Sequence, residues 1–387
     1  MNFELSREHQ MLRKAVREFA QKKITPNADE WDNNHYLPVD EVLRPMGELG
    51  FLGAVIPEEY GGDDMGWLAA SIITEEIAYA SSSLRVQVNL VMIGCAYPIV
   101  LYGTEEAKKK YVPRLCTAEY LGGFAITEPN AGSDVMSIET VAEDRGDHYV
   151  LNGQKTWISN ANQADVVIVY AYTDKEKRGK GLSAFIVEPK TMNGVSTTDL
   201  DKLGSHSSPT GEIFFQDTKV PRKNLLGNPG DGARIVFTSL GNTRLSAAAG
   251  AVGCAQACLD IATKYATERR QFGQDVGQFQ MNQDLVAQMA VEVEAARLLV
   301  YRAAGQKDAG NLGNNLEVAQ AKYFAGETAM KCANYAMRIM GAYGYSTEYP
   351  VARFYRDIPT YVIVEGSSNV CKSIIAMDKL GYRKANR

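Results

Sequence analysis

The spacing of apolar residues changes twice along this 387-residue chain, and this change restricts the possible folds more than any other feature. Near the start, apolar residues recur every three or four positions, for example at Leu12, Val16 and Phe19, which is typical of an amphipathic helix. Short strand-like runs follow, and the helical spacing then returns. We therefore expect an α-helical domain over residues 1–120, a β domain over 121–230 and a second α-helical domain over 231–387.

The middle third is predicted to be an antiparallel β domain. The runs "ADVVIVYAYT", "LSAFIVEP" and "EIFFQDTKVP" are rich in Val, Ile, Phe and Tyr and are separated by Gly, Pro and Lys. The pair Asn152–Gly153 predicts a hairpin turn. No helical period of useful length separates the runs, so alternating β–α–β units are not expected.

The last third is predicted to form a four-helix bundle. An apolar stripe recurs at spacings of four, four, three and four residues, and four long helices fit between residues 231 and 387. The overall expectation is a multi-domain α+β fold with a helical, a β and a helical part. The stripe consists of Leu285, Met289, Val293, Ala296 and Val300.

Composition excludes several classes of protein. The net charge of −5 gives no basic surface for nucleic acid, and no apolar run approaches the roughly 20 residues that span a bilayer. The six cysteines are scattered without a CxxC pair and there are only four histidines, so no metal site is expected. The N-terminus is amphipathic and carries acidic residues, and it lacks a signal-peptide pattern, so we expect a cytoplasmic protein with reduced thiols.

Nucleotide-binding signatures of the Rossmann and P-loop types are absent, but three other segments could bind a ligand. The loop "FAITEPNAGSDV" offers Thr127 and Ser133 to a phosphate-bearing ligand, or is a plain surface loop. In "KTWIS", Trp157 either packs in a core or at an interface, or lies against a flat heterocycle, with Ser159 bonding to its edge. In "ERRQFGQ", Arg269 either follows the helix-dipole preference or contacts a pyrophosphate.

The order and spacing of these segments carry more information than each alone. "TEPNAGSD", "KTWIS", "ERRQFG", "RIMGAYGYSTEYPVARFYRD" and "VEGSSN" follow one another, and the chain resembles the acyl-CoA dehydrogenase family from end to end. The resemblance implies non-covalent FAD, an acyl-CoA substrate, a homotetramer and electron-transfer flavoprotein as the acceptor. No docking motif for that acceptor is visible in the sequence itself.

The resemblance also assigns cofactor-binding roles. It places the flavin ring against Trp157, with Thr127 and Ser159 at its polar edge, and Ser133 near the pyrophosphate or the pantetheine of CoA. Gly341 matches a glycine of the family, whereas Arg338 departs from the usual glutamine. Two further groups follow: Arg269, Gln271 and Phe272 match a motif that reaches the FAD of a neighbouring subunit, and Ser367 and Asn369 match positions near the adenosine.

Glu365, in "YVIVEGSSN", has two interpretations from its residues alone. It is either a surface acid at a strand end or helix start, or an acid kept dry for chemistry. The resemblance aligns it with the family's catalytic base, which removes the α proton of the thioester while the β hydrogen leaves as hydride to flavin N5. Arg244 matches an arginine near the CoA path.

The acyl group is indicated by two residues. Arg85 stands among Leu, Val and Met, where it is either a core-edge residue with its head in solvent or a carboxylate ligand. It aligns with the arginine that binds the distal carboxylate in glutaryl-CoA dehydrogenases. Val364 stands where the decarboxylating members carry tyrosine, so the resemblance is closest to the non-decarboxylating branch, which forms glutaconyl-CoA.

Other functions remain open at this stage. The chain could dehydrogenate a neutral short, branched or cyclic acyl-CoA, because most members with other substrates also lack that tyrosine. A flavin oxidase on the same scaffold is conceivable. From a different class, the chain could be a non-catalytic acyl-CoA-binding protein, although the presence of Glu365 and Trp157 argues against that.

Overall fold

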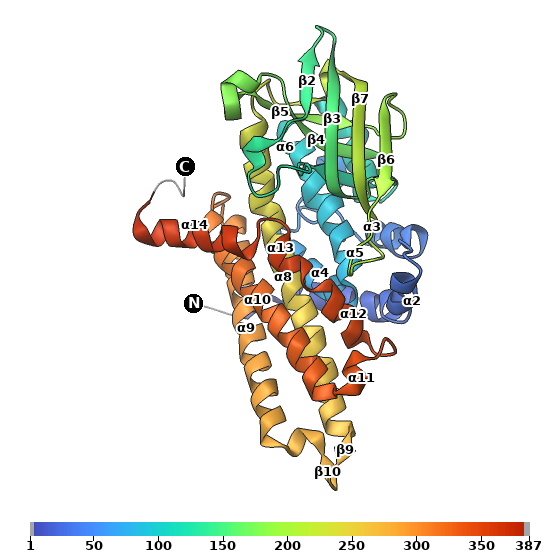
Figure 1. The fold of residues 1–387 in the computed structure, drawn as a ribbon, viewed down its shortest axis with the longest axis vertical. Coiled ribbons are helices and arrows are strands. Elements are labelled where there is room, and N and C mark those ends of the chain that lie inside the picture. The colour runs from blue at the N-terminus through green and yellow to red at the C-terminus, as the bar shows by residue number, and fades with distance from the viewer. Residues whose placement is uncertain (1–3, 383–387) are drawn as a thin grey trace.

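The computed structural model describes residues 4–382 and confirms the three-part fold. Figure 1 shows the β-sheet at one end and long helices running away from it, with the N-terminal helices packed alongside. Ser6 accepts the His9 amide at the start of the first helix, an N-cap that satisfies a free backbone donor. The N-terminal helices are α1 (Arg7–Phe19), α2 (Ala28–Asn33), α3 (Arg44–Glu48), α4 (Trp67–Ala80), α5 (Ser82–Val88), α6 (Tyr97–Tyr102) and α7 (Glu105–Cys116).

The β domain is mainly antiparallel, as expected, with one exception. The sheet runs in the order β6-β7-β3-β2-β4-β5-β8, and β1 pairs parallel with β4, so that Gly122 lies opposite Val166. Its strands are β1 (Gly122–Ala125), β2 (Val141–Asp144), β3 (His148–Ser159), β4 (Val166–Tyr172), β5 (Leu182–Val187), β6 (Val195–Asp199), β7 (Thr210–Pro221) and β8 (Leu225–Leu226).

The hairpin predicted at Asn152–Gly153 is wrong. Both residues lie inside β3, at a register shift against β7. Gly153 has a φ of +148°, and a β-carbon there would lie 2.5 Å from the Thr140 hydroxyl. The glycine therefore permits a bulge where two strands approach closely, which is the other common use of glycine in a strand.

The C-terminal part contains three long helices and a shorter fourth. Within residues 4–382, the three long helices pack side by side below the sheet in Figure 1, and the fourth projects to one side. Short helices connect the third long helix to the last one. The elements are α8 (Gly232–Glu268), β9 (Arg270–Gln271), β10 (Gln274–Asp275), α9 (Gln280–Asp308), α10 (Asn315–Met340), α11 (Ala342–Tyr345), α12 (Pro350–Asp357), α13 (Thr360–Ile363) and α14 (Ser368–Leu380).

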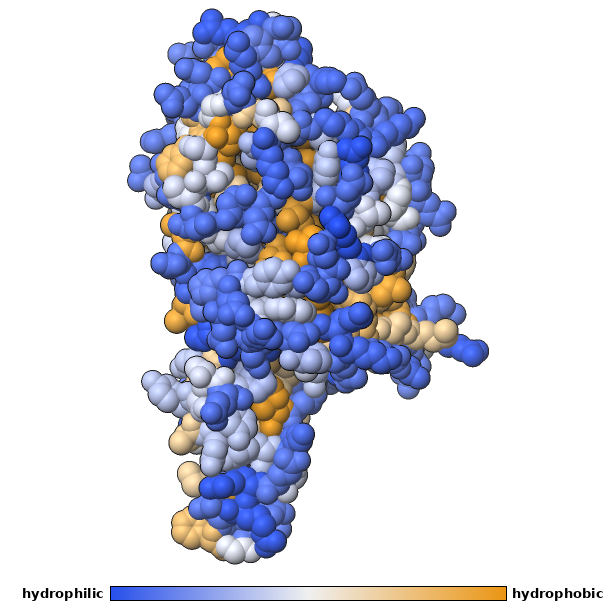
Figure 2. Space-filling model, turned by 90° about the vertical axis from the view of Figure 1, so that its right-hand side faces the viewer, coloured by the Kyte–Doolittle hydropathy of each residue, from blue (hydrophilic) through white to orange (hydrophobic). Residues whose placement is uncertain are grey.

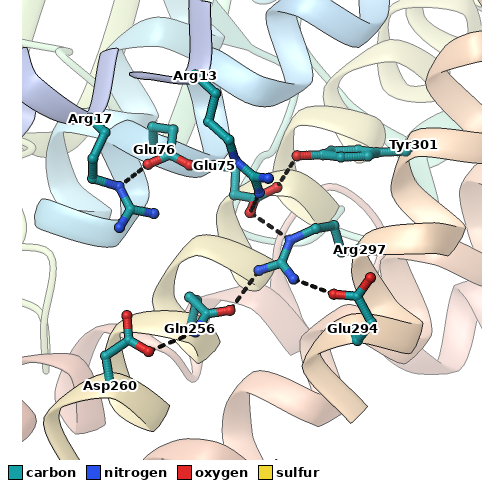
Figure 3. Close-up of polar contacts among 9 residues, drawn as sticks. All are labelled: Arg13, Arg17, Glu75, Glu76, Gln256, Asp260, Glu294, Arg297 and Tyr301. Atoms are coloured by element: carbon teal, nitrogen blue, oxygen red, sulfur yellow. Dashed lines mark hydrogen bonds and ion pairs between the residues drawn. The ribbon is translucent and has the colours of Figure 1, made fainter. Parts of the chain in front are cut away.

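A partly buried network of charges joins α1 and α4 to the C-terminal helices (Figure 3). Glu75 accepts hydrogen bonds from Arg13, Arg297 and the Tyr301 hydroxyl at 2.8–3.0 Å. Glu76 pairs with Arg13 and Arg17. Both carboxylates are buried, and each faces at least two cationic or neutral donors, so their desolvation is offset by hydrogen bonds.

Two helical stretches, Ser82–Tyr102 and Gly232–Glu268, are long and apolar enough to cross a membrane by length and composition, contrary to the expectation from the sequence. In each, 78% of the apolar window is buried inside the protein. The face shown in Figure 2 is mostly hydrophilic, with apolar areas interrupted by polar side chains. Packing within the molecule therefore accounts for the hydropathy of both helices.

Candidate active site

Glu365 lies in a tight turn between α13 and α14. Glu365 and Gly366 both have left-handed backbone conformations, with φ of +58° and +88°. Val364 ends α13, and Ser367 caps α14 by accepting the Val370 amide. The strand-end interpretation of Glu365 is therefore wrong, since the residues before it form one helical turn, Thr360–Ile363. A left-handed glutamate costs about 1–3 kcal/mol, so the surroundings must hold it in place.

Three side chains from distant parts of the chain hold this turn. The Asn89 Nδ2 donates to Glu365 Oε1 at 3.2 Å. The Arg244 Nε donates to the Glu365 carbonyl at 2.8 Å, and the Lys322 Nζ donates to the Gly366 carbonyl at 2.6 Å. Each partner is buried, and Glu365 itself is half-buried. The turn is therefore fixed through its backbone as well as its carboxylate.

Burial changes the acidity of the two cations in this set. It lowers the pKa of the Arg244 guanidinium, with Cys371 and Glu365 opposing the change. It also lowers the pKa of the Lys322 ammonium, again with Cys371 and Glu365 opposing. Asn89 and Lys322 were missed from the sequence, because an asparagine in "NLVMIG" and a lysine in "AQAKYF" carry no pattern that points to residue 365.

Arg85 lies on α5 and is only 2% exposed. Its guanidinium carbon lies 5.0 Å from the centroid of the Tyr361 ring. Within residues 4–382 no carboxylate forms an ion pair with it, and its Nε atom is buried without a hydrogen-bond partner. The core-edge interpretation with a solvated head is wrong, because the whole side chain is buried. A buried cation without an acidic partner costs folding free energy, and this cost falls when an anion lies beside it.

Trp157 is presented at the surface of the β domain. It is 59% exposed and has a φ of +59°, so the core-packing interpretation is wrong. The adjacent Thr156 amide donates to the Thr127 carbonyl at 2.9 Å, which joins the "KTWIS" strand to the "TEPNAGSD" loop. Ser159 is half-buried at the end of β3, and Ser133 is exposed.

A buried ion pair fixes these two segments to each other. The Lys155 Nζ lies 2.7 Å from Glu128 Oε1 and donates to the Ile126 carbonyl at 3.0 Å. Burial lowers the pKa of Lys155 to about 8, while Glu128 opposes the change. Burial would raise the pKa of Glu128, but Lys155 and backbone donors keep it below its usual value. A flat exposed ring beside an ordered polar loop fits a flavin with its phosphates.

The remaining predicted cofactor residues lie elsewhere. Figure 1 places β9 and β10 at the end of the long helices farthest from the sheet. Arg269, Gln271 and Phe272 are exposed there, and Phe272 is 93% exposed with a φ of +52°. One chain does not bring them to Trp157. Gly341 ends α10 with a φ of +60°, and Asn369 is exposed at the start of α14.

Family models match nearly the whole chain. The acyl-CoA dehydrogenase N-terminal domain matches residues 6–119, the middle domain residues 123–218 and the C-terminal domain residues 230–380. The chain is a member of the acyl-CoA dehydrogenase family. Members of this family are FAD-dependent flavoprotein oxidoreductases that act on acyl-CoA thioesters.

Among the acyl-CoA dehydrogenases, this chain is highly similar to a glutaryl-CoA dehydrogenase. Glutaryl-CoA dehydrogenase of Desulfococcus multivorans is 68% identical over 100% of both chains. A solved glutaryl-coenzyme A dehydrogenase in complex with glutaryl-CoA has a TM-score of 0.98 and 68% identity, covering 100% of this chain and 98% of that one. A chain from the electron transferring flavoprotein structure of Acidaminococcus fermentans has a TM-score of 0.96 and 38% identity, covering 99% and 100%.

The described residues contain the six cysteines but no cluster suited to a metal ion. All six cysteines are free and buried. Among residues 4–382, no group of three or more His, Cys, Asp or Glu side chains is placed to hold a metal ion.

Proposed function

We propose that this acyl-CoA dehydrogenase converts glutaryl-CoA to glutaconyl-CoA and releases the product with its carboxylate intact. The observation that carries the proposal is the buried Arg85 without an acidic partner. A five-carbon diacid thioester would supply the missing anion. The 68% identity to glutaryl-CoA dehydrogenase supports the same substrate.

Glu365 is the proposed catalytic base. Its carboxylate takes the α proton, the β hydrogen leaves as hydride and a C=C bond forms between the two carbons. When bound, FAD supplies the acceptor for that hydride. Asn89 holds one carboxylate oxygen, so the other oxygen is available for the proton. Arg244 and Lys322 fix the turn that aims the carboxylate.

The Glu365 amide has a second proposed role. Within residues 4–382 it donates to no acceptor, since Val364 before it is extended, with a ψ of 166°, and this ends the hydrogen bonding of α13. A backbone N–H of this kind can hydrogen-bond the thioester oxygen as negative charge develops there. This interaction would acidify the α C–H bond, which is otherwise too weak an acid for a carboxylate to deprotonate.

Val364 is the basis for proposing that CO₂ is retained. Valine has no hydrogen-bonding group, so it cannot compete with Arg85 for the distal carboxylate. A carboxylate paired with a buried guanidinium keeps its charge on oxygen, which disfavours its loss as CO₂.

The other parts of the proposal concern cofactor contacts and assembly. Trp157, Thr127, Ser159 and Ser133 would hold FAD within one chain. The exposed Arg269, Gln271 and Phe272 would reach the FAD of a neighbouring subunit in a homotetramer. Ser367, Asn369 and Gly341 would lie near the adenosine. Electron-transfer flavoprotein is the proposed acceptor, and the cytoplasm the proposed location.

A product assay tests the substrate and the fate of the carboxylate. We expect kcat/KM to be higher for glutaryl-CoA than for butyryl-CoA or cyclohexanecarboxyl-CoA, with glutaconyl-CoA formed and no CO₂ released. A preference for the neutral thioesters would exclude the role of Arg85. Crotonyl-CoA with stoichiometric CO₂ would exclude the role of Val364.

A single substitution tests the base. We expect Glu365→Gln to retain FAD and to bind glutaryl-CoA while losing turnover by at least about a thousandfold, because an amide cannot accept the α proton. Flavin absorbance, ligand titration and stopped-flow reduction measure the three properties separately. Turnover near that of the wild type would show that another group is the base.

A further inference from the structure

Arg85 is in close contact with a glycine of the longest helix. Gly250 is buried inside α8, and a β-carbon added there would lie 2.8 Å from Arg85 Nε and 2.9 Å from its Cδ. Glycine inside a helix is less favourable than alanine. Its φ is not in the left-handed region, so backbone conformation does not require it. The added β-carbon would also lie 3.0 Å from the Tyr361 hydroxyl, so the space beside Arg85 and Tyr361 is what distinguishes glycine from alanine at this position.

Tyr361 bounds the guanidinium on another side. Its ring faces the guanidinium carbon at 5.0 Å, within the range of cation–π attraction. Its hydroxyl lies 3.1 Å from Ser82 Oγ and 3.5 Å from Cys254 Sγ, so the ring is fixed at its far end. Burial raises the pKa of Tyr361, and the phenol therefore stays neutral and leaves Arg85 without a charged partner.

The Tyr361 ring and the Glu365 carboxylate belong to one short segment. Tyr361 lies on α13, four residues before Glu365. The α13 backbone approaches α10 closely, since a β-carbon at Gly326 would lie 2.9 Å from the Tyr361 carbonyl. The support for Arg85 and the proposed base are thus held on the same piece of backbone.

We propose that Gly250 and Tyr361 determine the specificity of this enzyme for an acyl chain that ends in a carboxylate. Gly250 leaves the space that the Arg85 side chain occupies, and Tyr361 supplies the aromatic face that keeps the guanidinium in position. Neither residue needs to contact the substrate, so both are positioning residues. The inference rests on the proposed function, because it requires Arg85 to bind the distal carboxylate.

Gly250→Ala tests the space. The added methyl group would crowd both the Arg85 side chain and the Tyr361 hydroxyl that supports it. We therefore expect the ratio of kcat/KM for glutaryl-CoA to that for butyryl-CoA to fall at least tenfold, mainly through the KM of glutaryl-CoA. Gly305→Ala is the matched control, since Gly305 lies inside α9 with no atom within 4 Å of an added β-carbon. Its ratio should stay within about twofold of that of the wild type.

Two substitutions at Tyr361 test the aromatic face and provide an answer if Gly250→Ala does not fold. Tyr361→Phe keeps the ring and should change the ratio less than about threefold. Tyr361→Leu removes the face, and we expect a fall of at least about fivefold. Retained flavin absorbance shows that each variant is folded.

Different results would contradict the proposed substrate and the proposed roles of Gly250 and Tyr361. A wild-type enzyme that does not prefer glutaryl-CoA overturns the proposed function. A wild-type preference that survives both Gly250→Ala and Tyr361→Leu, or falls equally in Gly305→Ala, overturns only the roles of Gly250 and Tyr361.

Discussion

Two arginines in neighbouring regions of this molecule, the half-buried Arg297 and the buried Arg85, have opposite surroundings. Arg297, on α9, donates to Glu75, Glu294 and Gln256 in the network of Figure 3. Arg85, on α5, has no carboxylate partner and one unpaired nitrogen among the described residues. Glu75 lies on α4, the helix just before α5, so the two regions are separated by only a few residues of chain.

The difference separates structural charge from charge available to a ligand. A buried ion pair with complete hydrogen bonding has little left to offer a substrate, and breaking it leaves a charge without a partner. A buried cation without an anion is maintained at a cost in folding free energy, and binding an anion recovers it. Burial alone therefore does not identify a binding residue, and the proposed role of Arg85 rests on its burial together with the absence of an acidic partner among the described residues.

The largest expected effect comes from removing Glu75, the central acceptor of the network in Figure 3. Glu75→Ala removes the acceptor of two arginines and a tyrosine, and we expect the free energy of unfolding to fall by about 3–5 kcal/mol. Urea denaturation at fixed protein and FAD concentration measures it. Glu294→Ala, which removes an exposed partner of the same Arg297, should cost less than about 1 kcal/mol. Equal losses in the two variants would contradict the distinction.

Asp357 is a buried acid that is less completely hydrogen-bonded than Glu75 but, unlike Arg85, has one hydrogen-bond partner for its charged group among the described residues. We therefore expect the stability of the protein to depend on the ionisation of Asp357. One carboxylate oxygen accepts the Ser205 amide at 2.6 Å, and the other has no partner. Burial raises the pKa of Asp357 to about 6, with Arg353 opposing the change. Because the folded pKa is above the unfolded value, the contribution to stability is present below about pH 4 and lost as pH rises through 6.

Asp357→Asn, a neutral isostere, should remove this loss. Relative to the wild type, the variant should gain stability between pH 4 and 6, by no more than about 3 kcal/mol at neutral pH. Urea denaturation at a series of pH values gives the difference curve. A difference that does not vary with pH would show that Asp357 has the same acidity in both states.

Arg85→Met is expected to change substrate preference rather than stability, which is the opposite of the expectation for Glu75→Ala. Methionine fills a similar volume without an unpaired charge, so we expect unchanged or higher stability. The preference for glutaryl-CoA over butyryl-CoA should fall about ten- to a hundredfold, corresponding to about 1.5–3 kcal/mol for a charge-assisted hydrogen bond. Stability and the ratio of kcat/KM are measured on the same preparation. A variant that is several kcal/mol less stable with an unchanged ratio would place Arg85 with the structural charges.

The smallest expected effect comes from Lys322, whose ammonium group donates to a backbone carbonyl and not to a carboxylate. Lys322→Met removes the hydrogen bond to the Gly366 carbonyl, and we expect kcat to fall roughly tenfold with little change in KM, because the turn that carries Glu365 loosens. The pH dependence of kcat should shift as well. Lys307→Met is the control, since Lys307 is equally buried but bonds to Asn242 and the Leu312 carbonyl. Equal changes in kcat would indicate general destabilisation.

Much of the fold followed from local patterns. The return of the helical period after residue 230 placed the C-terminal helices, because one apolar face every 3.6 residues must be buried against a neighbour. The parallel pairing of β1 with β4 was not predictable from strand composition. The meaning of Gly153 was also misjudged, since only the approach of Thr140 shows that the glycine forms a bulge.

Some residues of the candidate site were also predicted from the sequence, whereas others are brought together only by the tertiary structure. Motif order located Glu365 and Trp157, since residue types and spacings are properties of the chain itself. The contacts that hold Glu365 come from Asn89, Arg244 and Lys322, which are 276, 121 and 43 positions away in the chain. No local pattern connects such residues.

The sequence by itself determined the three-part architecture, the family resemblance and the types of side chain available for chemistry. Tertiary structure alone decided which of the charges removed from solvent have partners: the buried Glu75 is paired with the half-buried Arg297, whereas the buried Arg85 has no carboxylate partner among the described residues. The physical reason is that periodicity and propensity act over neighbouring residues, whereas desolvation and pairing depend on atoms brought together from distant parts of the chain.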